Sequence, residues 1–171
     1  DHPPEPDLGM GTSHVTSCGV ERWPVKVLGD RDRNAVVTDP VAATIRELRL
    51  LDRPTAPLPP DTRVPPHELR TYRVTAIVSQ VLVESDGDWH LVLADPEAGS
   101  QTMIAEIPDS ACALGTGWES KYAAARRALR TLPRRALVDI DGVGFFDVDH
   151  GQRGRAPNDF ELHPVLALQA H

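Results

Sequence analysis

The residues best suited to chemistry in this sequence lie between positions 147 and 163. His150, Glu161 and His163 carry imidazole and carboxylate groups, which are ligands for zinc and other divalent metals. Glu161 and His163 are two positions apart on a predicted strand, so their side chains project to the same side. Gly151 and Pro157 allow the preceding loop to turn toward that strand. We therefore predict a metal site at His150, Glu161 and His163, although the spacing matches no recognised metal signature.

The same region also predicts a site for an anionic ligand. Arg153 and Arg155 stand in the loop, and a guanidinium group is a planar fork suited to phosphate or carboxylate. On two earlier strands, His90 and Glu106 lie out of phase with their apolar neighbours, which places both on the polar side of the sheet. The predicted ligand-binding residues are His90, Arg153, Arg155, Asn158 and His163.

Two other interpretations of these residues remain open. The order of His150, Asn158 and His163 is similar to the His, Asn, His order of HNH-type nucleases, but the intervals are too short to contain the helix of that motif. Alternatively, Glu and His on strands are often only solvent-facing residues, and the region then binds nothing.

Charge argues against general binding to a polyanion. The formal net charge is -7 at pH 7, which opposes nonspecific attraction to nucleic acid. Positive charge is nevertheless concentrated along a predicted helix and its exit, at Lys121, Arg126, Arg127, Arg130, Arg134 and Arg135. This group is either a place for an anionic ligand or a solvated helix face.

The elements that must position these residues follow from hydrophobic periodicity. Alternation predicts a long, bent strand over 72–83 and strands over 89–93 and 102–107. A helix is predicted over 119–132, where Pro133 ends it, and two strands follow over 137–143 and 160–168. Three strands, a helix and two strands is the order of an OB fold, so we predict a mainly β protein with a five-stranded OB-like barrel.

Residues 1–68 are predicted to form an N-terminal extension to a barrel domain of residues 69–171. Residues 1–17 read as a tail without periodicity. Asp39 as a cap and Pro40 as the first helical residue predict a short amphipathic helix over 40–51. Six prolines within residues 53–66 predict an extended connector along the surface.

Several motifs after the tail carry a family resemblance. They are CGVERWPVK at 18–26, MIAEIP at 103–108, GVGFFD at 142–147, HGQ at 150–152 and ELHPVL at 161–166. With these motifs the chain resembles a family of exported bacterial proteins of unassigned function. The resemblance implies export and an OB-like barrel, and it supplies no activity.

A second resemblance is to staphylococcal nuclease, which has the same strand order and a similar turn to Asp86-Gly87-Asp88. That family needs an arginine in the third strand and an Asp-Thr-Pro-Glu stretch after it. This chain has neither between Met103 and Asp109. The calcium site and catalytic residues of that family are therefore not assigned here.

The two cysteines bear on the compartment. Cys18 and Cys112 are either a disulfide or two separate buried thiols, and we expect the disulfide. It would close a loop of roughly 95 residues and contribute on the order of 4 kcal/mol to stability. No apolar run approaches the roughly 18 to 20 residues of a membrane-spanning helix. Because the sequence opens at Asp1 without signal-peptide character, we expect a secreted or periplasmic protein whose leader has been removed.

These observations lead to three functional hypotheses. The favoured one is an exported, noncatalytic OB-fold module that binds an anionic ligand or oligomer, with nucleic acid as one candidate. The alternative is a metal-dependent hydrolase of phosphodiesters that uses His150, Glu161 and His163, with a divalent metal such as zinc as its cofactor. The third is a structural or assembly protein.

Overall fold

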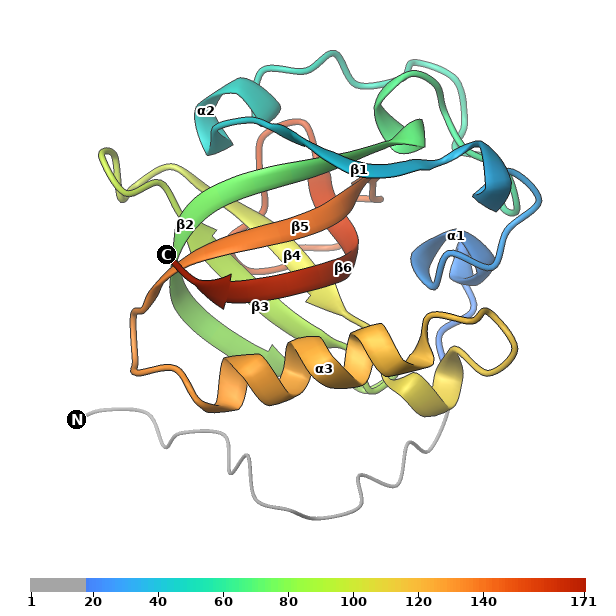
Figure 1. Ribbon diagram of the computed structural model, residues 1–171. Helices are drawn as coiled ribbons and strands as arrows, with labels where there is room; N and C mark the ends of the chain where they lie inside the picture. The colour runs from blue at the N-terminus through green and yellow to red at the C-terminus, as the bar shows by residue number, and fades with distance from the viewer. Residues whose placement is uncertain (1–17) are drawn as a thin grey trace.

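The computed structural model describes residues 18–171, and its main feature is a closed β-barrel (Figure 1). The sheet order is β1-β2-β3-β4-β6-β5, and a further pairing of β2 with β5 closes the barrel. The strands are β1 (Val37–Ala42), β2 (Arg70–Val83), β3 (Trp89–Ala94), β4 (Thr102–Ile107), β5 (Leu137–Phe146) and β6 (Phe160–Ala170). The predicted OB-like barrel is confirmed, with β1 as an additional strand. The predicted tail of residues 1–17 lies outside the described residues.

The long strand β2 bends so that it serves two sides of the barrel. Its first half, from Thr71 to Ile77, pairs with β5, and its second half pairs with β3. The register shifts between Val78 and Gln80, as expected for a β-bulge. The bend predicted for the first barrel strand is therefore confirmed.

Helix α3 (Glu119–Arg130) packs across the barrel between β4 and β5 in the chain (Figure 1). Its buried residues are Tyr122, Ala125, Arg126 and Leu129. The short helices are α1 (Trp23–Lys26), α2 (Ile45–Leu48), η1 (Arg33–Ala35), η2 (His67–Leu69) and η3 (Ser110–Cys112). Within residues 18–171, no helix combines the length and the apolar character that crossing a membrane requires.

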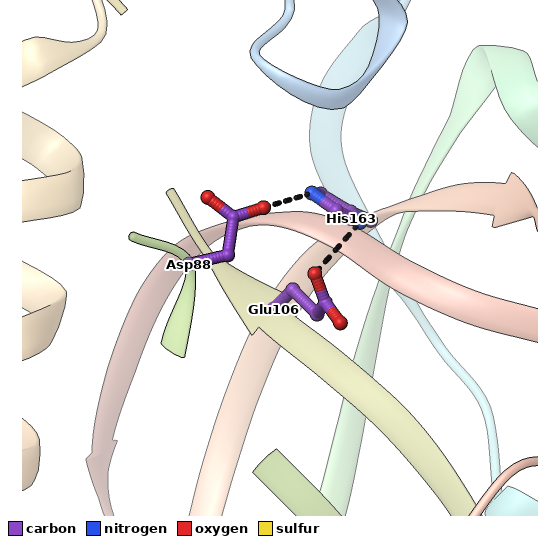
Figure 2. A group of neighbouring side chains, drawn as sticks. All are labelled: Asp88, Glu106 and His163. Carbon is purple, nitrogen blue, oxygen red and sulfur yellow. Dashed lines mark ion pairs between the residues drawn. The ribbon is translucent and has the colours of Figure 1, made fainter. Parts of the chain in front are cut away.

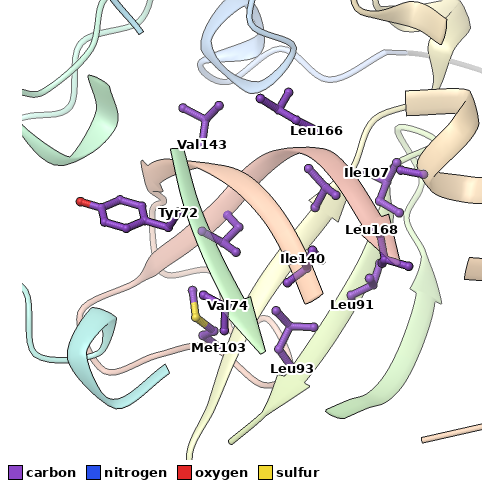
Figure 3. Packing of buried hydrophobic residues seen from close by; sticks show 14 of the residues in the cluster. Tyr72, Val74, Leu91, Leu93, Met103, Ile107, Ile140, Val143, Leu166 and Leu168 are labelled. Carbon is purple, nitrogen blue, oxygen red and sulfur yellow. The ribbon is translucent and has the colours of Figure 1, made fainter. Parts of the chain in front are cut away.

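The interior of the barrel is filled by side chains from alternate strand positions (Figure 3). Leu91 and Leu93 of β3 and Met103 of β4 point inward together with Val74 and Ile140, and all five are buried. Because side chains alternate along a strand, the intervening positions of β3 and β4 point to the outer face. His90 of β3 and Glu106 of β4 occupy two of those outer positions.

The prediction of a helix over residues 40–51 is wrong for most of that range. Its first residues belong instead to β1, which pairs in parallel with the start of β2. Pro40 lies within this strand at the edge of the sheet, where a missing N–H is tolerated. Tertiary pairing therefore outweighs the local helix signal.

The helix that does form is α2, and Thr44 rather than Asp39 caps it. Thr44 Oγ1 accepts a hydrogen bond from the N–H of Glu47 at 3.1 Å, and Glu47 Oε2 accepts one from the N–H of Thr44 at 2.8 Å. This reciprocal capping box fixes the start of the helix. Between α2 and η2, the chain contains no helix or strand.

A buried ion pair within the N-terminal part of the chain and one disulfide to the barrel hold that part in place. Arg63 is paired with Asp30 at 2.8 Å, and both side chains are fully buried. Cys18 and Cys112 form a disulfide, which confirms the predicted pair. The segment Cys18–Lys26, called the N-terminal strap below, is thereby linked to η3 next to the end of β4.

Candidate metal centre

Five polar side chains meet on the outer face of the barrel, where β3, β4 and β6 lie side by side. His90 of β3 and Glu106 of β4 are direct register partners. Glu161 and His163 lie on β6, which pairs with β4, and the residue between them is in the core. Asp88 comes from the hairpin that precedes β3. We call these five residues the carboxylate–imidazole cluster.

The imidazole of His163 has a carboxylate near each of its two nitrogens (Figure 2). Nε2 lies 3.3 Å from Oδ2 of Asp88. Nδ1 lies 3.5 Å from Oε2 of Glu106 and 3.6 Å from Oε2 of Glu161. A charge-assisted N–H···O bond is shorter, at roughly 2.7–2.9 Å. The ring is therefore surrounded by carboxylates at ion-pair distance, without a close hydrogen bond to any of them.

Most polar atoms of the cluster are buried without a hydrogen-bond partner among the described residues. This is true of both carboxylate oxygens of Asp88 and Glu161 and of both ring nitrogens of His163. The exposed fractions of these residues are 0%, 2% and 1%. Burial of charged groups without hydrogen bonds is costly, so the cluster requires a compensating interaction.

His90 is fully engaged and orients Glu106. Its Nε2 must donate to the backbone carbonyl of Arg153 at 2.8 Å, because a carbonyl can only accept. Its Nδ1 lies 3.0 Å from Oε1 of Glu106 and donates to that carboxylate. Burial alone would lower the pKa of His90, but these two contacts raise it. His90 therefore acts as a buried imidazolium that holds Glu106, with neither nitrogen free for a metal.

The pKa values of the cluster show how strongly its charges interact. Burial alone would raise the pKa of Glu106, but the charge of His163 and the hydrogen bond from His90 lower it to about 2. Burial likewise would lower the pKa of His163, but Glu106, with Asp88 and Glu161, raises it to about 10. Burial raises the pKa of Glu161 to about 7, against the opposing effect of His163. The cluster thus attracts positive charge strongly.

The N-terminal strap brings a further positive charge to this face. Lys26 is half-buried, and its Nζ lies 5.8 Å from the centre of the Phe145 ring. That ring is in turn 5.2 Å from the ring of His163. Burial alone would lower the pKa of Lys26, but the negative charges of four nearby carboxylates raise it above its ordinary value. These carboxylates are those of Asp147, Glu106, Glu161 and Asp88.

The donor set fits one divalent cation. Ligand atoms of Asp88, Glu106 and His163, one from each, lie within 4.8 Å of one another. A single ion can span this separation, because its bonds to oxygen or nitrogen are about 2.0–2.6 Å long. Glu161 is an adjacent fourth candidate, and a cation would satisfy the buried oxygens of Asp88 and Glu161 that have no hydrogen-bond partner. Carboxylates combined with one imidazole suit manganese or zinc.

The structure brings together two of the three residues predicted as metal ligands. Glu161 and His163 are in the cluster, whereas the His150 side chain is 63% exposed and lies 3.3 Å from Oδ2 of Asp147. From the sequence, Glu106 is predicted only to lie on the polar side of the sheet, and Asp88 is not predicted as a ligand. Asp88 belongs to an Asp-Gly-Asp turn, a sequence that is common in hairpins of every function, so no local signal distinguished it.

The other predicted ligand-binding residues have different surroundings. Asn158 donates to the backbone carbonyls of Leu48 and Leu51 at 2.9 and 3.0 Å, and it thereby holds α2 against the barrel. Arg155 pairs with Asp149 at 3.0 Å and with Asp159 at 2.7 Å. The side chain of Arg153 is exposed, and only its carbonyl contacts His90.

One surface groove is separate from the cluster. It measures about 620 Å³ and is lined by residues that include Thr44, Arg73, Asp95, Leu137 and His171. None of the cluster residues lines it. The cluster is therefore not part of this groove, and Asp88, Glu161 and His163 are almost completely buried.

Comparisons with known proteins provide little guidance on function. No protein-family model matches the chain, and no curated protein matches it. Among solved structures, the chain is similar to the crystal structure of a putative aspartyl-tRNA synthetase from Leishmania major Friedlin, with a TM-score of 0.45 and 15% identity. The alignment covers 79% of this chain and 21% of that chain, so this chain spans about a fifth of the length of that structure.

Proposed function

We propose that this protein is an OB-like binding module that holds one divalent cation in the carboxylate–imidazole cluster. Asp88, Glu106 and His163 are the proposed ligands, with Glu161 beside them. The observation that carries the proposal is the set of buried carboxylate oxygens and ring nitrogens without hydrogen-bond partners, gathered around one imidazole. A cation bound to these atoms would satisfy them together.

The surroundings of the ligands support this proposal. His90 holds Glu106 through a hydrogen bond of 3.0 Å and is itself fixed by the Arg153 carbonyl. Outer partners of this kind orient metal ligands, and their removal typically reduces metal affinity by about 10- to 100-fold. The cluster therefore contains a supporting residue in addition to the ligands.

Burial favours a held ion over a catalytic one. Catalytic metal sites keep an open coordination position for water or substrate. Here Asp88, Glu161 and His163 are almost completely buried, and Lys26 of the N-terminal strap lies over the Phe145 ring, which packs beside His163. The phosphodiesterase hypothesis is for this reason the weaker one.

Metal analysis of tag-free protein tests the proposal. Dialysis against manganese or zinc followed by elemental analysis should give one bound ion per chain. Asp88→Asn and His163→Gln should each remove it, whereas His150→Gln is the matched control because its histidine is exposed and outside the cluster. Failure of the wild-type protein to bind either ion, or equal binding by H163Q, would contradict the proposal.

Binding of an anionic oligomer is the second candidate. It is favoured by Arg153, whose side chain reaches solvent while its carbonyl is anchored by His90. The face formed by the second and third barrel strands and the neighbouring loops binds oligonucleotides in many OB folds. Titration with a labelled single-stranded DNA should show binding that Arg153→Ala weakens, with Arg31→Ala as the control at an exposed arginine elsewhere. Equal affinity of both variants and the wild type would reject this site.

We also infer that the protein works in an oxidising compartment, as a secreted or periplasmic protein. The Cys18–Cys112 disulfide supports this, because such bonds persist outside the reducing cytosol. The resemblance to exported bacterial proteins points in the same direction. Thiol labelling of the protein in its native cells should find both cysteines blocked until a reductant is added, and free thiols there would contradict export.

A further inference from the structure

The Cys18–Cys112 disulfide lies beside the hairpin that supplies Asp88. Cys112 Sγ is 4.0 Å from the backbone carbonyl of Asp86, two residues before Asp88. Asp86 Oδ1 in turn accepts a hydrogen bond from the N–H of Asp88 at 3.1 Å. One short set of contacts thus connects the crosslink to a proposed ligand of the cation.

Gly19 closes the remaining space between the strap and this hairpin. A Cβ atom at Gly19 would lie 2.6 Å from the Trp23 ring and 3.1 Å from Oδ2 of Asp86. The Trp23 indole N–H donates to the carbonyl of Cys112 at 3.2 Å, so the ring is fixed on the same side. The start of the strap is therefore packed against the hairpin, where Asp88 is fully buried.

The strap has a second anchor at Arg22. Its guanidinium pairs with Glu68 at 2.8 Å and also donates to the carbonyl of Phe146 at 2.8 Å. Only residues 19–21 lie between this anchor and the disulfide. Breaking the disulfide would consequently free the beginning of the strap and the hairpin contact, while the rest of the strap stays attached.

We propose that the Cys18–Cys112 disulfide locks the start of the strap as a cover over the Asp88 side of the cation site, so that its reduction opens the site to exchange. This inference rests on the proposed function. A dithiol reductant supplies two electrons and two protons, which convert the disulfide to two thiols, and the reductant becomes a disulfide. In the oxidised protein the cation is held behind the cover, and in the reduced protein it equilibrates with solvent.

Release of manganese from the full chain tests the cover. The oxidised protein is loaded with manganese and mixed with excess EDTA. The transfer of manganese from the protein to EDTA is followed by electron paramagnetic resonance. Pretreatment with a phosphine, which reduces the disulfide and takes up the oxygen of water, should accelerate release by about 10-fold or more, as expected for local opening. The Cys18→Ser/Cys112→Ser variant should release at the fast rate with or without phosphine.

Hydrogen exchange on the same samples separates local opening from unfolding. After reduction, amides of residues 18–21 and 84–88 should exchange faster, while those of β3 and β4 keep their protection. Trp23→Ala, with the disulfide intact, should loosen the same cover and give an intermediate release rate. Loss of protection throughout the barrel on reduction would overturn the local cover.

The two proposals fail in distinguishable ways. One bound manganese per chain with equal release rates before and after verified reduction would overturn the cover and leave the cation site standing. If no manganese binds in either redox state, the proposed cation site is wrong. The proposed role of the strap as a cover for that site is then wrong as well.

Discussion

Arg22 and Glu68 form a two-pronged ion pair, with Nη1 2.8 Å from Oε1 and Nη2 2.9 Å from Oε2. Both side chains are buried, at 4% and 0% exposure. Glu68 also accepts hydrogen bonds from the N–H groups of Val64 and Phe146. This pair therefore connects the N-terminal strap, the connector before β2 and the end of β5 at one buried point.

Removing one member of this pair should destabilise the whole domain. Arg22→Ala leaves the Glu68 carboxylate buried without its counter-charge, and such a change typically costs about 3–5 kcal/mol. Urea unfolding followed by circular dichroism should show this decrease in the free energy of unfolding. Arg31→Ala is the control, since Arg31 is 80% exposed in its pair with Asp61, and it should change stability by about 0.5 kcal/mol or less. Equal effects of the two substitutions would contradict the central role of Arg22.

Neutralising Lys26 should strengthen cation binding. The ammonium group experiences the same carboxylates as the proposed ion, so the two positive charges repel each other. We expect Lys26→Met to raise manganese affinity by about 10-fold, which corresponds to about 1.4 kcal/mol. Isothermal titration with Lys121→Met, at the only other lysine of the chain and on the exposed side of α3, provides the control. Weaker binding by K26M would show that Lys26 supports the site instead.

The cation-free protein should lose stability at alkaline pH through His163. The pKa of this residue is raised from the ordinary 6.5 to about 10 in the folded protein. A raised pKa stabilises the fold fully below the unfolded value, and this contribution disappears as the pH rises through the folded value. The difference in unfolding free energy between wild type and His163→Gln should therefore shrink between pH 6.5 and 10. Chemical denaturation in the presence of EDTA measures it, and a difference that is constant over this range would argue against a charged His163.

Asn158 should contribute to the stability of the fold and not to cation binding. Asn158→Ala removes the two hydrogen bonds to the carbonyls of Leu48 and Leu51, and leaving such groups without partners costs about 1–3 kcal/mol. Thermal unfolding should show the loss, while manganese binding stays at one ion per chain. Asn34→Ala, at an exposed asparagine in η1, is the matched control. A loss of manganese without a loss of stability would instead place Asn158 in the site.

The barrel could be predicted because its signals are local. Alternating apolar residues around Val74 and Leu91 mark strands whatever their partners are, and Pro133 ends the helix by its own chemistry. β1 could not be predicted in the same way. Asp39 and Pro40 have the local pattern of a helix start, and only the parallel partner β2 makes this segment a strand.

The site was predicted in part for a similar reason. Glu161 and His163 share a strand face, which the period of two reveals directly. Asp88 reaches them across the sheet from a hairpin 75 residues before His163, a relation set by barrel closure rather than by sequence spacing. His150 is close to them in sequence, yet its loop carries the side chain into solvent.

His90 holds loop 147–159 through a hydrogen bond to the backbone carbonyl of Arg153, and the side chain of Arg153 takes no part in this contact. A substitution at position 153 should therefore leave the attachment of this loop to β3 intact. A spin label or fluorophore attached at position 153 would therefore be held by a fixed main chain close to the cluster. It would report on changes inside the cluster without altering the contacts among the cluster residues.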